Sequence, residues 1–230
     1  MTVRTIVLDI EGTITDVAFV TSVLFPFARR ALPDFVRAHG AEPEVAAALA
    51  AVAEASGIPA GDTEALVAEL DAWAAADRKD WPLKTLQGLV WRHGFEAGEL
   101  RGHLYDEVPA KLRAWKAGGR RLVIYSSGSV EAQKLLFRHS VFGDLSGLFD
   151  AHYDSRIGAK VEAASYAAIA AALGEAAEAI LFLSDNPREL EAARAAGWHV
   201  AELRREPGAA AGTAPQGWPV ATDLDGVALP

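Results

Sequence analysis

The fold is decided by the run Thr5-Ile6-Val7-Leu8-Asp9-Ile10-Glu11-Gly12-Thr13. Its first part is short, apolar and rich in β-branched residues, and it closes on two acids and a glycine. Runs of this kind are typical of strands that are buried on both faces of a parallel sheet. We therefore predict a buried strand here, followed directly by a polar turn.

The same pattern recurs twice further along the chain. Each of these apolar runs ends in small or acidic residues, and a helical pattern follows it, over Val130–His139 and over Pro187–Ala196. Another strand is expected over Trp198–Leu203. Alternating strands and helices predict an α/β fold with a doubly wound parallel sheet. The two recurring runs are Leu122-Val123-Ile124-Tyr125-Ser126-Ser127-Gly128-Ser129 and Ile180-Leu181-Phe182-Leu183-Ser184-Asp185-Asn186-Pro187.

The alternation is interrupted between about Val17 and His103, where no convincing buried strand is found. Alanine- and leucine-rich stretches there have helical spacing, and Gly94 is expected to end the last of them. We predict a helical domain over 17–103, inserted into a core domain formed by 1–16 and 104–230. The tail from Arg205 onward is rich in Ala, Gly and Pro and is expected to be irregular. The helical stretches are Pro43–Ser56, Thr63–Ala76 and Pro82–His93.

Composition excludes several classes of function. The chain has 230 residues, of which 51% are hydrophobic, so it can build a real core. A net charge of −9 argues against nucleic-acid binding through a basic face, and the absence of cysteine excludes disulfides, thiolate metal sites and cysteine nucleophiles. No apolar run reaches the ~18 residues of a membrane span, and no leader peptide is expected. We predict a soluble, cytoplasmic protein, and a monomer, since no feature suggests an obligate partner.

Polar side chains follow each of the three predicted strands. Asp9 and Glu11 are two residues apart, which places both carboxylates on one side of an extended chain. Ser126 and Ser127 follow the second strand, and Asp185 follows the third. Ligands of open α/β sheets bind outside the carboxyl ends of the strands. These residues are therefore expected to meet in one crevice.

Carboxylates and hydroxyls of this kind suit phosphate chemistry with Mg²⁺. Hard oxygen ligands favour Mg²⁺, and a Ser-Ser-Gly turn before a helix offers hydroxyl and N–H donors to a phosphate. A carboxylate can attack phosphorus to give an aspartyl-phosphate. A carboxylate about 4 Å from a negative charge is opposed by about 4 kcal/mol at an effective dielectric of 20, so a cation is needed. Lys160, which lies between the second and third loops, is the candidate.

Each of these residues also has an ordinary structural interpretation. Asp9 and Glu11 could cap a turn at a strand end, and Lys160 could be a solvated lysine. The serines could form a helix-entry turn, with Ser129 as N-cap. Asp185 could cap the helix that begins near Pro187. A second acidic run, Asp223-Leu224-Asp225-Gly226, has no further motif after it, and we interpret it as a surface turn.

Taken together, the ordered motifs resemble those of haloacid-dehalogenase-superfamily phosphatases. These are Asp9-Ile10-Glu11-Gly12-Thr13, then Ser126-Ser127-Gly128-Ser129, then Lys160, then Ser184-Asp185. Glutamate at position 11 is the unusual form of the first motif, where aspartate is common. With the stretch from Ile124 to Phe137, it is similar to the enolase-phosphatases of methionine salvage. The stretches Leu86–Trp91 and Gly102–Tyr105 also resemble that family.

The resemblance implies a specific activity. Its members enolise 2,3-diketo-5-methylthiopentyl 1-phosphate and remove the phosphate to give an acireductone, with one Mg²⁺ per chain. Asp9 would be the nucleophile and a metal ligand, with Glu11 the second acid and also metal-associated. Ser126, Ser127 and Lys160 would contact the substrate, and Asp185 would be the third metal ligand. The helical insert would be the cap of this superfamily.

Two positions depart from the family pattern. Asn186-Pro187 follows Asp185 where a small apolar residue is expected, and this could change the metal shell. Thr15-Asp16 stands where Thr-Pro is more common, which concerns the hinge between the domains.

Three other functions share part of the pattern. Another capped Mg²⁺-dependent phosphomonoesterase would have all four motifs, but its second acid is usually aspartate. A non-catalytic phospho-accepting switch would resemble a response-regulator receiver, which is about half as long and has no helical insert after its first strand. A haloalkanoate dehalogenase would keep the nucleophile but would need neither Glu11 nor Asp185.

Overall fold

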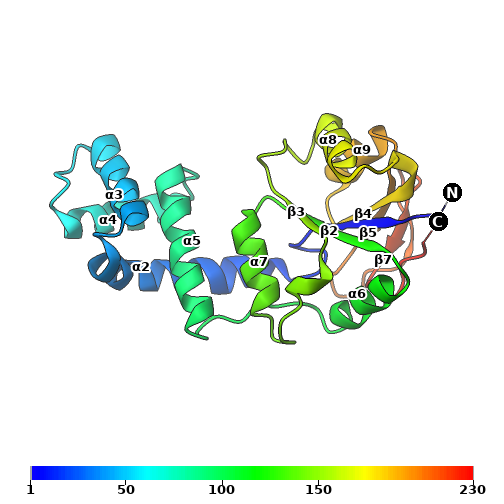
Figure 1. Ribbon diagram of the computed structural model, residues 1–230, viewed down its shortest axis with the longest axis horizontal. Helices are drawn as coiled ribbons and strands as arrows, with labels where there is room; N and C mark the ends of the chain where they lie inside the picture. The colour runs from blue at the N-terminus through cyan, green and yellow to red at the C-terminus, as the bar shows by residue number, and fades with distance from the viewer. Residues whose placement is uncertain (1, 230) are drawn as a thin grey trace. The chain divides into compact units, whose positions relative to one another are not determined.

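Strand β1 (Thr5–Leu8) lies in the interior of the sheet, between β2 and β4, and is fully buried (Figure 1). A computed structural model describes residues 2–229. Within them the strand order is β3-β2-β1-β4-β5-β7-β6, and every neighbouring pair is parallel except the antiparallel β6 and β7. The predicted α/β fold with a parallel sheet is confirmed. The remaining strands are β2 (Arg121–Tyr125), β3 (Ala151–Tyr153), β4 (Ile180–Ser184), β5 (His199–Leu203), β6 (Gly212–Thr213) and β7 (Pro219–Ala221).

The register aligns the carboxyl ends of the three central strands. Leu8 at the end of β1 pairs with Ile124 of β2 on one side and with Leu183 of β4 on the other. The residues that follow these strands therefore emerge at one edge of the sheet. This edge carries the polar turns that were predicted from the sequence.

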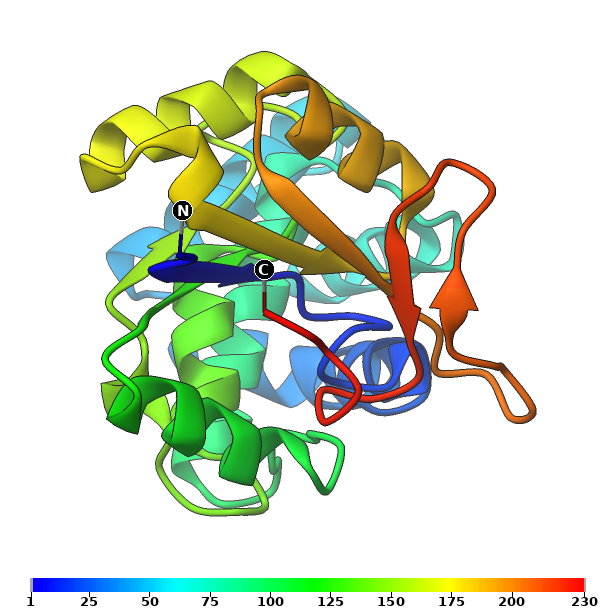
Figure 2. The same cartoon turned by 90° about the vertical axis from the view of Figure 1, so that its right-hand side faces the viewer.

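Helices cover both faces of the sheet. In Figure 2, α8 (Ala163–Leu173) and α9 (Pro187–Ala195) lie over one face, while α6 (Val108–Ala117) and α7 (Val130–Arg138) lie over the other. The core under α8 is aromatic: Tyr166 packs edge-on against Tyr125, Phe182 and Trp198, with ring centroids 5.2–5.5 Å apart. Two short 3₁₀ turns, η2 (Ser146–Leu148) and η3 (Ala177–Ala179), join the layers.

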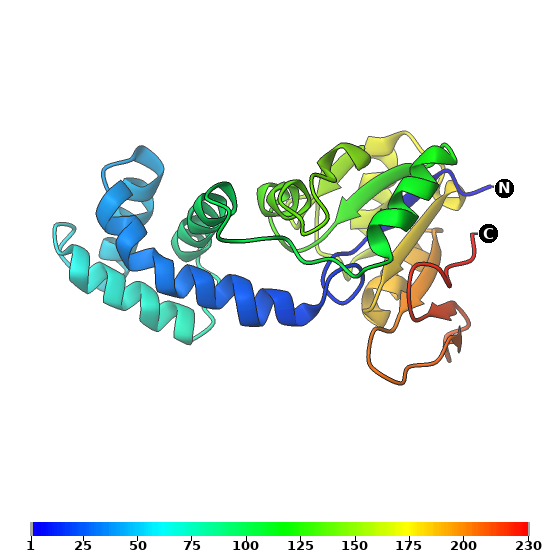
Figure 3. The ribbon, with the colours of Figure 1, turned by 90° about the horizontal axis from the view of Figure 1, so that it is seen from below.

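The chain divides into two compact units. One comprises the residues up to Val17 and those from Arg101 onward, and the other is Ala18–Leu100. The second unit is helical (Figure 3). A short α1 (Val17–Phe19) and a π-helical turn (Val20–Leu24) lead into α2 (Phe25–His39), α3 (Pro43–Ser56), α4 (Thr63–Ala75) and α5 (Trp81–Glu96). In residues 2–229 no helix combines the length and the apolarity needed to span a membrane.

Local structure differs from or adds to the expectations in three places. Gly94 does not end a helix: α5 continues to Glu96, and a Cβ at Gly94 would come within 2.4 Å of the Phe27 ring, so this glycine permits close packing. Helix α2 had no prediction, because Pro33 inside it obscures the helical pattern. The tail is not irregular throughout, since β6 and β7 extend the sheet and Val220 is buried.

Candidate functional site

The structure brings most of the predicted site residues together at the edge of the sheet. Asp9 follows β1, Ser126 follows β2 and Asp185 follows β4, and these three strands are adjacent. The backbone N–H of Asp9 continues the ladder by donating to the carbonyl of Leu183 at 3.0 Å. Lys160 contacts Asp9 directly, and Ser126 contacts Glu11 directly. Asp185 lies against the loop that follows Asp9, and Ser127 is exposed beside Ser126.

Asp9 is buried, and its two oxygens have different surroundings. Oδ1 accepts a hydrogen bond from the N–H of Ile10 at 2.8 Å and lies 2.6 Å from Nζ of Lys160. Oδ2 faces the hydroxyl of Ser184 at 3.3 Å, but that hydroxyl is also 3.0 Å from Oε2 of Glu189. Because the serine has one proton for the two carboxylates, and Glu189 is the nearer, Oδ2 is the less tightly held oxygen of Asp9.

Lys160 is the buried cation of the site. Its Nζ lies 2.6 Å from Asp9 Oδ1 and 2.6 Å from Glu189 Oε2, with only 10% of its side chain exposed. Burial alone would lower the pKa of Lys160, but the carboxylates of Asp9 and Glu189 outweigh this effect and raise the pKa. The lysine therefore stays charged and offsets part of the negative charge around Asp9.

The loop before α8 holds Lys160 in place through its carbonyl groups. Tyr125 Oη donates to the carbonyl of Gly158, Ser165 Oγ to that of Ala159, and Tyr166 Oη to that of Lys160 at 2.6 Å. Gly158 has a φ of +144°, and a Cβ there would lie 2.2 Å from Ser165 Oγ. This tight turn requires glycine and aims the lysine at the sheet edge.

Glu189 is a member of this cluster that the sequence interpretation missed. It lies in the first turn of α9, is buried, and also accepts from Nδ2 of Asn186 at 3.2 Å. Burial, followed by the charge of Asp9, raises the pKa of Glu189. No local signal marks this role, because an acid in the first turn of a helix is common and the contact with Lys160 comes from a distant loop.

Glu11 is joined to the loop of Ser126–Ser129, called the serine loop. Ser126 Oγ donates to Glu11 Oε2 at 3.2 Å and accepts from the N–H of Gly128 at 3.1 Å. Burial is the main cause that raises the pKa of Glu11, and the charge of Asp9 adds to it. The structure thus favours a Glu11 carboxyl that keeps its proton to a higher pH than an ordinary glutamate.

The serine loop is held by hydrogen bonds from helix α7. Gln133 on α7 is buried, and its amide Nε2 donates to the carbonyls of Gly128 and Tyr153 at 2.8 and 2.9 Å. Ser129 caps α7 by accepting from the N–H of Ala132 at 3.2 Å, as predicted. The loop therefore presents Ser126 and the start of α7 in a defined orientation.

Asp185 packs against the loop after β1. Its N–H donates to Thr13 Oγ1 at 3.2 Å, and a Cβ at Gly12, whose φ is +73°, would lie 2.1 Å from its Oδ2. Only glycine fits at position 12. The predicted capping role belongs instead to Asn186, whose side chain accepts from the N–H of Arg188. The carboxyl of Asp185 is therefore not used to cap α9.

Replacing Asp185 by asparagine is expected to stabilise the protein at pH 7 in the absence of divalent ions. Asp185 is exposed as a residue, but partial desolvation of its carboxyl, and then the charge of Asp9, raise its pKa from 3.8 to about 6. The folded state therefore binds more protons between these values, so the contribution of Asp185 to stability falls as pH rises through this interval. Because the residue lies at the surface, the gain in Tm is about 1–3 °C.

Thermal unfolding in EDTA at pH 7 and at pH 4 measures this effect. The gain for Asp185→Asn should be present at pH 7 and small at pH 4. An equal gain in Tm at both pH values would show that the ionised carboxylate of Asp185 is not the source of the destabilisation.

The donor set has the chemistry that Mg²⁺ requires. The predicted ligands Asp9, Glu11 and Asp185 are hard oxygen donors, and burial first and the charge of Asp9 second raise the pKa values of Glu11 and Asp185. Among the residues that the structure describes, no three His, Asp or Glu side chains form a ready-made metal-binding group. Mg²⁺ commonly takes one or two carboxylates with water and phosphate, so this finding is compatible with the donor chemistry. The magnesium ligands remain a prediction.

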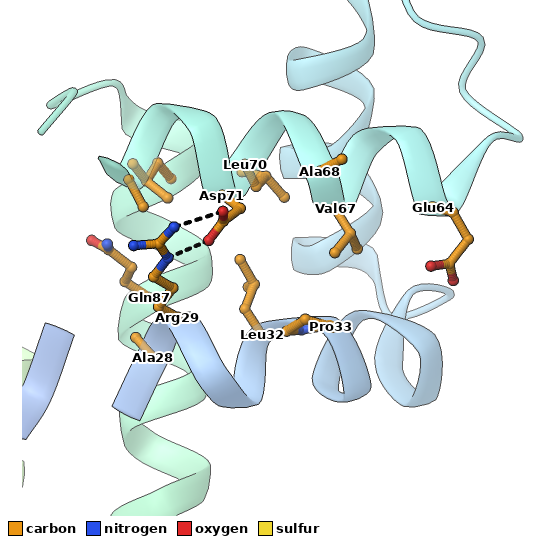
Figure 4. A pocket seen from close by; sticks show the side chains of 12 residues that line it. Ala28, Arg29, Leu32, Pro33, Glu64, Val67, Ala68, Leu70, Asp71 and Gln87 are labelled. Carbon is orange, nitrogen blue, oxygen red and sulfur yellow. Dashed lines mark hydrogen bonds and ion pairs between the residues drawn. The ribbon is translucent and has the colours of Figure 1, made fainter. Parts of the chain in front are cut away.

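A separate pocket of about 210 Å³ lies within the helical unit, between α2, α4 and α5 (Figure 4). Apolar side chains such as Leu32, Val67 and Leu70 form its wall, and Arg29 and Asp71 form an ion pair beside it. The pocket contains none of the predicted catalytic residues. This pocket is therefore separate from the predicted site at the sheet edge.

Comparisons with known proteins agree with this geometry. Residues 3–197 match a family model described as haloacid dehalogenase-like hydrolase. The chain is 52% identical to an Enolase-phosphatase E1 of Pectobacterium carotovorum over 89% of each chain, and 54% identical to one of Pseudomonas aeruginosa over 90% of this chain and 92% of that one. The crystal structure of the UTR4 protein of Saccharomyces cerevisiae matches with a TM-score of 0.82 and 34% identity, over 98% of this chain and 100% of that chain.

Proposed function

The chain belongs to the haloacid dehalogenase-like hydrolases, and among them to the family of the Enolase-phosphatase E1 proteins. From this membership and the geometry of the site, we propose that it catalyses the enolase-phosphatase reaction of methionine salvage. It would enolise 2,3-diketo-5-methylthiopentyl 1-phosphate and hydrolyse the phosphate to give the acireductone. The observation that carries the proposal is the contact of a buried lysine with the carboxylate of Asp9, at the end of the interior strand β1. Glutamate at position 11 favours this activity over that of other capped phosphatases.

Once the bound substrate has enolised, the phosphatase half begins with attack on phosphorus by Asp9. Oδ1 is held by Ile10 and Lys160, which leaves Oδ2 as the oxygen that reaches the phosphate. Lys160 offsets the repulsion between this carboxylate and the phosphate dianion. Ser126, Ser127 and the N–H groups at the start of α7 are proposed to bind the phosphate oxygens. The P–O bond to the enediol breaks as the aspartyl-phosphate forms.

Glu11 is proposed to carry the proton in both halves of the reaction. Burial and the charge of Asp9 raise the pKa of Glu11, which favours the protonated carboxyl that would donate to the leaving oxygen. In the second half the resulting carboxylate takes a proton from the water that attacks the aspartyl-phosphate. Ser126 orients this carboxyl by donating to its Oε2. Positioning and charge stabilisation thus replace any strong acid or base.

Mg²⁺ is the proposed cofactor, with one ion per chain held by Asp9, Glu11 and Asp185. Members of this hydrolase family generally depend on Mg²⁺, and the excess of carboxylates over lysine at the sheet edge supports the same requirement here. When bound, the ion would polarise a substrate carbonyl for enolisation and neutralise phosphate charge. Asn186 and Pro187 belong to the helix cap, which leaves the Asp185 carboxyl available.

The remaining assignments are proposals of the same kind. The helical unit Ala18–Leu100 would act as the cap, which keeps bulk water from the enediol during turnover. The substrate is a small phosphorylated molecule, and the protein is proposed to work in the cytoplasm as a monomer.

A substrate panel tests the proposed function. With Mg²⁺, the diketone phosphate should give phosphate together with the ultraviolet absorbance of the enediol. Simple monoesters such as a sugar phosphate or phosphoserine should react at least ~100-fold more slowly, because they lack the group that enolises. Faster release from a simple monoester would favour another capped phosphatase, and a stable phosphoprotein without turnover would favour the switch.

A further inference from the structure

Arg205 is the second residue after β5, yet its guanidinium is buried in the core unit. Only 9% of its side chain is exposed. Nε and Nη2 both donate to the carbonyl of Thr13, at 2.9 and 2.6 Å. Nη1 donates to Glu107 Oε1 at 2.7 Å and to the carbonyl of Thr222 at 3.3 Å. The guanidinium carbon also lies 4.3 Å from the centre of the Tyr105 ring.

These contacts converge on the loop that carries the acids. Thr13 is fully buried, two residues after Glu11, and its carbonyl receives two N–H donors from one planar guanidinium. Such a forked pair fixes the direction of the carbonyl as well as its distance. Arg205 therefore holds the backbone of this loop from a point 192 residues further along the chain.

Thr13 also contacts the other side of the site. Its Oγ1 accepts from the N–H of Asp185, and the neighbouring Gly12 packs against the Asp185 carboxylate. A shift of Thr13 would thus move the loop of Asp9 and Glu11 relative to Asp185. Arg205 contacts the Thr13 carbonyl, and its charge is balanced by an ion pair with Glu107.

We propose that Arg205 is a positioning residue, which sets the spacing between the two acids after β1 and the acid after β4. It acts through the carbonyl of Thr13 and touches neither the acids nor the substrate. Its effect on turnover rests on the proposed function, while its effect on the loop does not. Lysine cannot replace it, because a single ammonium group does not reproduce the fork.

The neighbouring Arg204 provides a matched control. It precedes Arg205 by one residue, and its Nε donates to Glu202 at 2.6 Å, away from the acid loop. The Arg205→Lys variant should lose about 10- to 100-fold in kcat with KM within about 3-fold, because misplaced groups slow the chemistry more than binding. Arg204→Lys should keep both values.

Amide hydrogen exchange gives a readout that does not depend on activity. The peptide that contains residues 10–15 should exchange faster in Arg205→Lys than in the wild type or in Arg204→Lys, while strands β2 and β4 exchange as before. Guanidinium chloride at low concentration should restore part of the kcat that Arg205→Ala loses, and it should leave the kcat of Arg204→Ala unchanged.

The outcomes separate the two proposals. Unchanged exchange of the 10–15 peptide in Arg205→Lys would overturn the positioning role, as would faster exchange throughout the core unit, which indicates general destabilisation. If the wild type does not convert the diketone phosphate, the proposed function fails, and hydrogen exchange still decides the role of Arg205.

Discussion

Asp9→Asn is expected to abolish phosphate release from the diketone phosphate. The neutral amide cannot attack phosphorus, so kcat should fall by about 10⁴- to 10⁶-fold. The fold should persist, because an asparagine oxygen can still accept the hydrogen bond from Ile10 N–H at the position of Oδ1. Phosphate release under saturating substrate, with circular dichroism of the same sample, measures both properties.

The chain contains its own control for this substitution. Asp223 opens the run Asp223-Leu224-Asp225-Gly226, which looks like the first motif but forms a turn in which Asp223 Oδ1 accepts from Gly226 N–H. Asp223→Asn keeps this hydrogen bond and should retain full activity. Appreciable turnover by Asp9→Asn, or its loss in Asp223→Asn, would refute the assignment of the nucleophile.

Lys160→Met is expected to reduce both activity and stability. Removing the ammonium group leaves the carboxylates of Asp9 and Glu189 facing each other without a buried cation. Breaking one side of a buried ion pair costs about 3–5 kcal/mol of unfolding free energy, and loss of a preorganised charge costs about 10²- to 10³-fold in kcat. Urea unfolding and steady-state kinetics measure the two losses separately.

A second substitution distinguishes these two roles of the lysine. Glu189→Gln in the Lys160→Met background removes one of the uncompensated charges, so a large part of the lost stability should return. Activity should stay low, because Asp9 still lacks its cation. If activity returns together with stability, Lys160 supports the fold and not the chemistry.

The sequence was sufficient for the architecture because the central strands are continuous apolar runs. Thr5–Leu8 and Ile180–Ser184 can be buried on both faces only in a parallel sheet, and the turns after them are marked by glycine, serine or proline. Short or interrupted elements carry no such signal. Strand β6 has two residues and β7 has three, which is too short for any periodicity, and Pro33 disguises α2.

The site was predictable where a residue directly follows a strand. Asp9, Ser126 and Asp185 are placed by the register of β1, β2 and β4, and that register follows from the hydrophobic pattern. Glu189 and Arg205 were missed because their roles depend on distant contacts. Glu189 meets Lys160 across two loops, and Arg205 reaches back to Thr13 from the tail. The local sequence around each residue does not indicate either contact.

Chemical trapping of the phosphoryl group tests most directly whether the Asp9 carboxylate attacks phosphorus. The enzyme with Mg²⁺ is mixed with excess diketone phosphate, quenched in acid within milliseconds, digested and analysed by mass spectrometry. The measurement is repeated on Glu11→Gln, in which water activation is impaired and the intermediate should accumulate. We predict a phosphoryl group on Asp9 in the peptide that spans residues 5–13, and none on that peptide in Asp9→Asn. A phosphoryl group on another residue, or continued turnover with Asp9 unmodified in both proteins, would contradict the account.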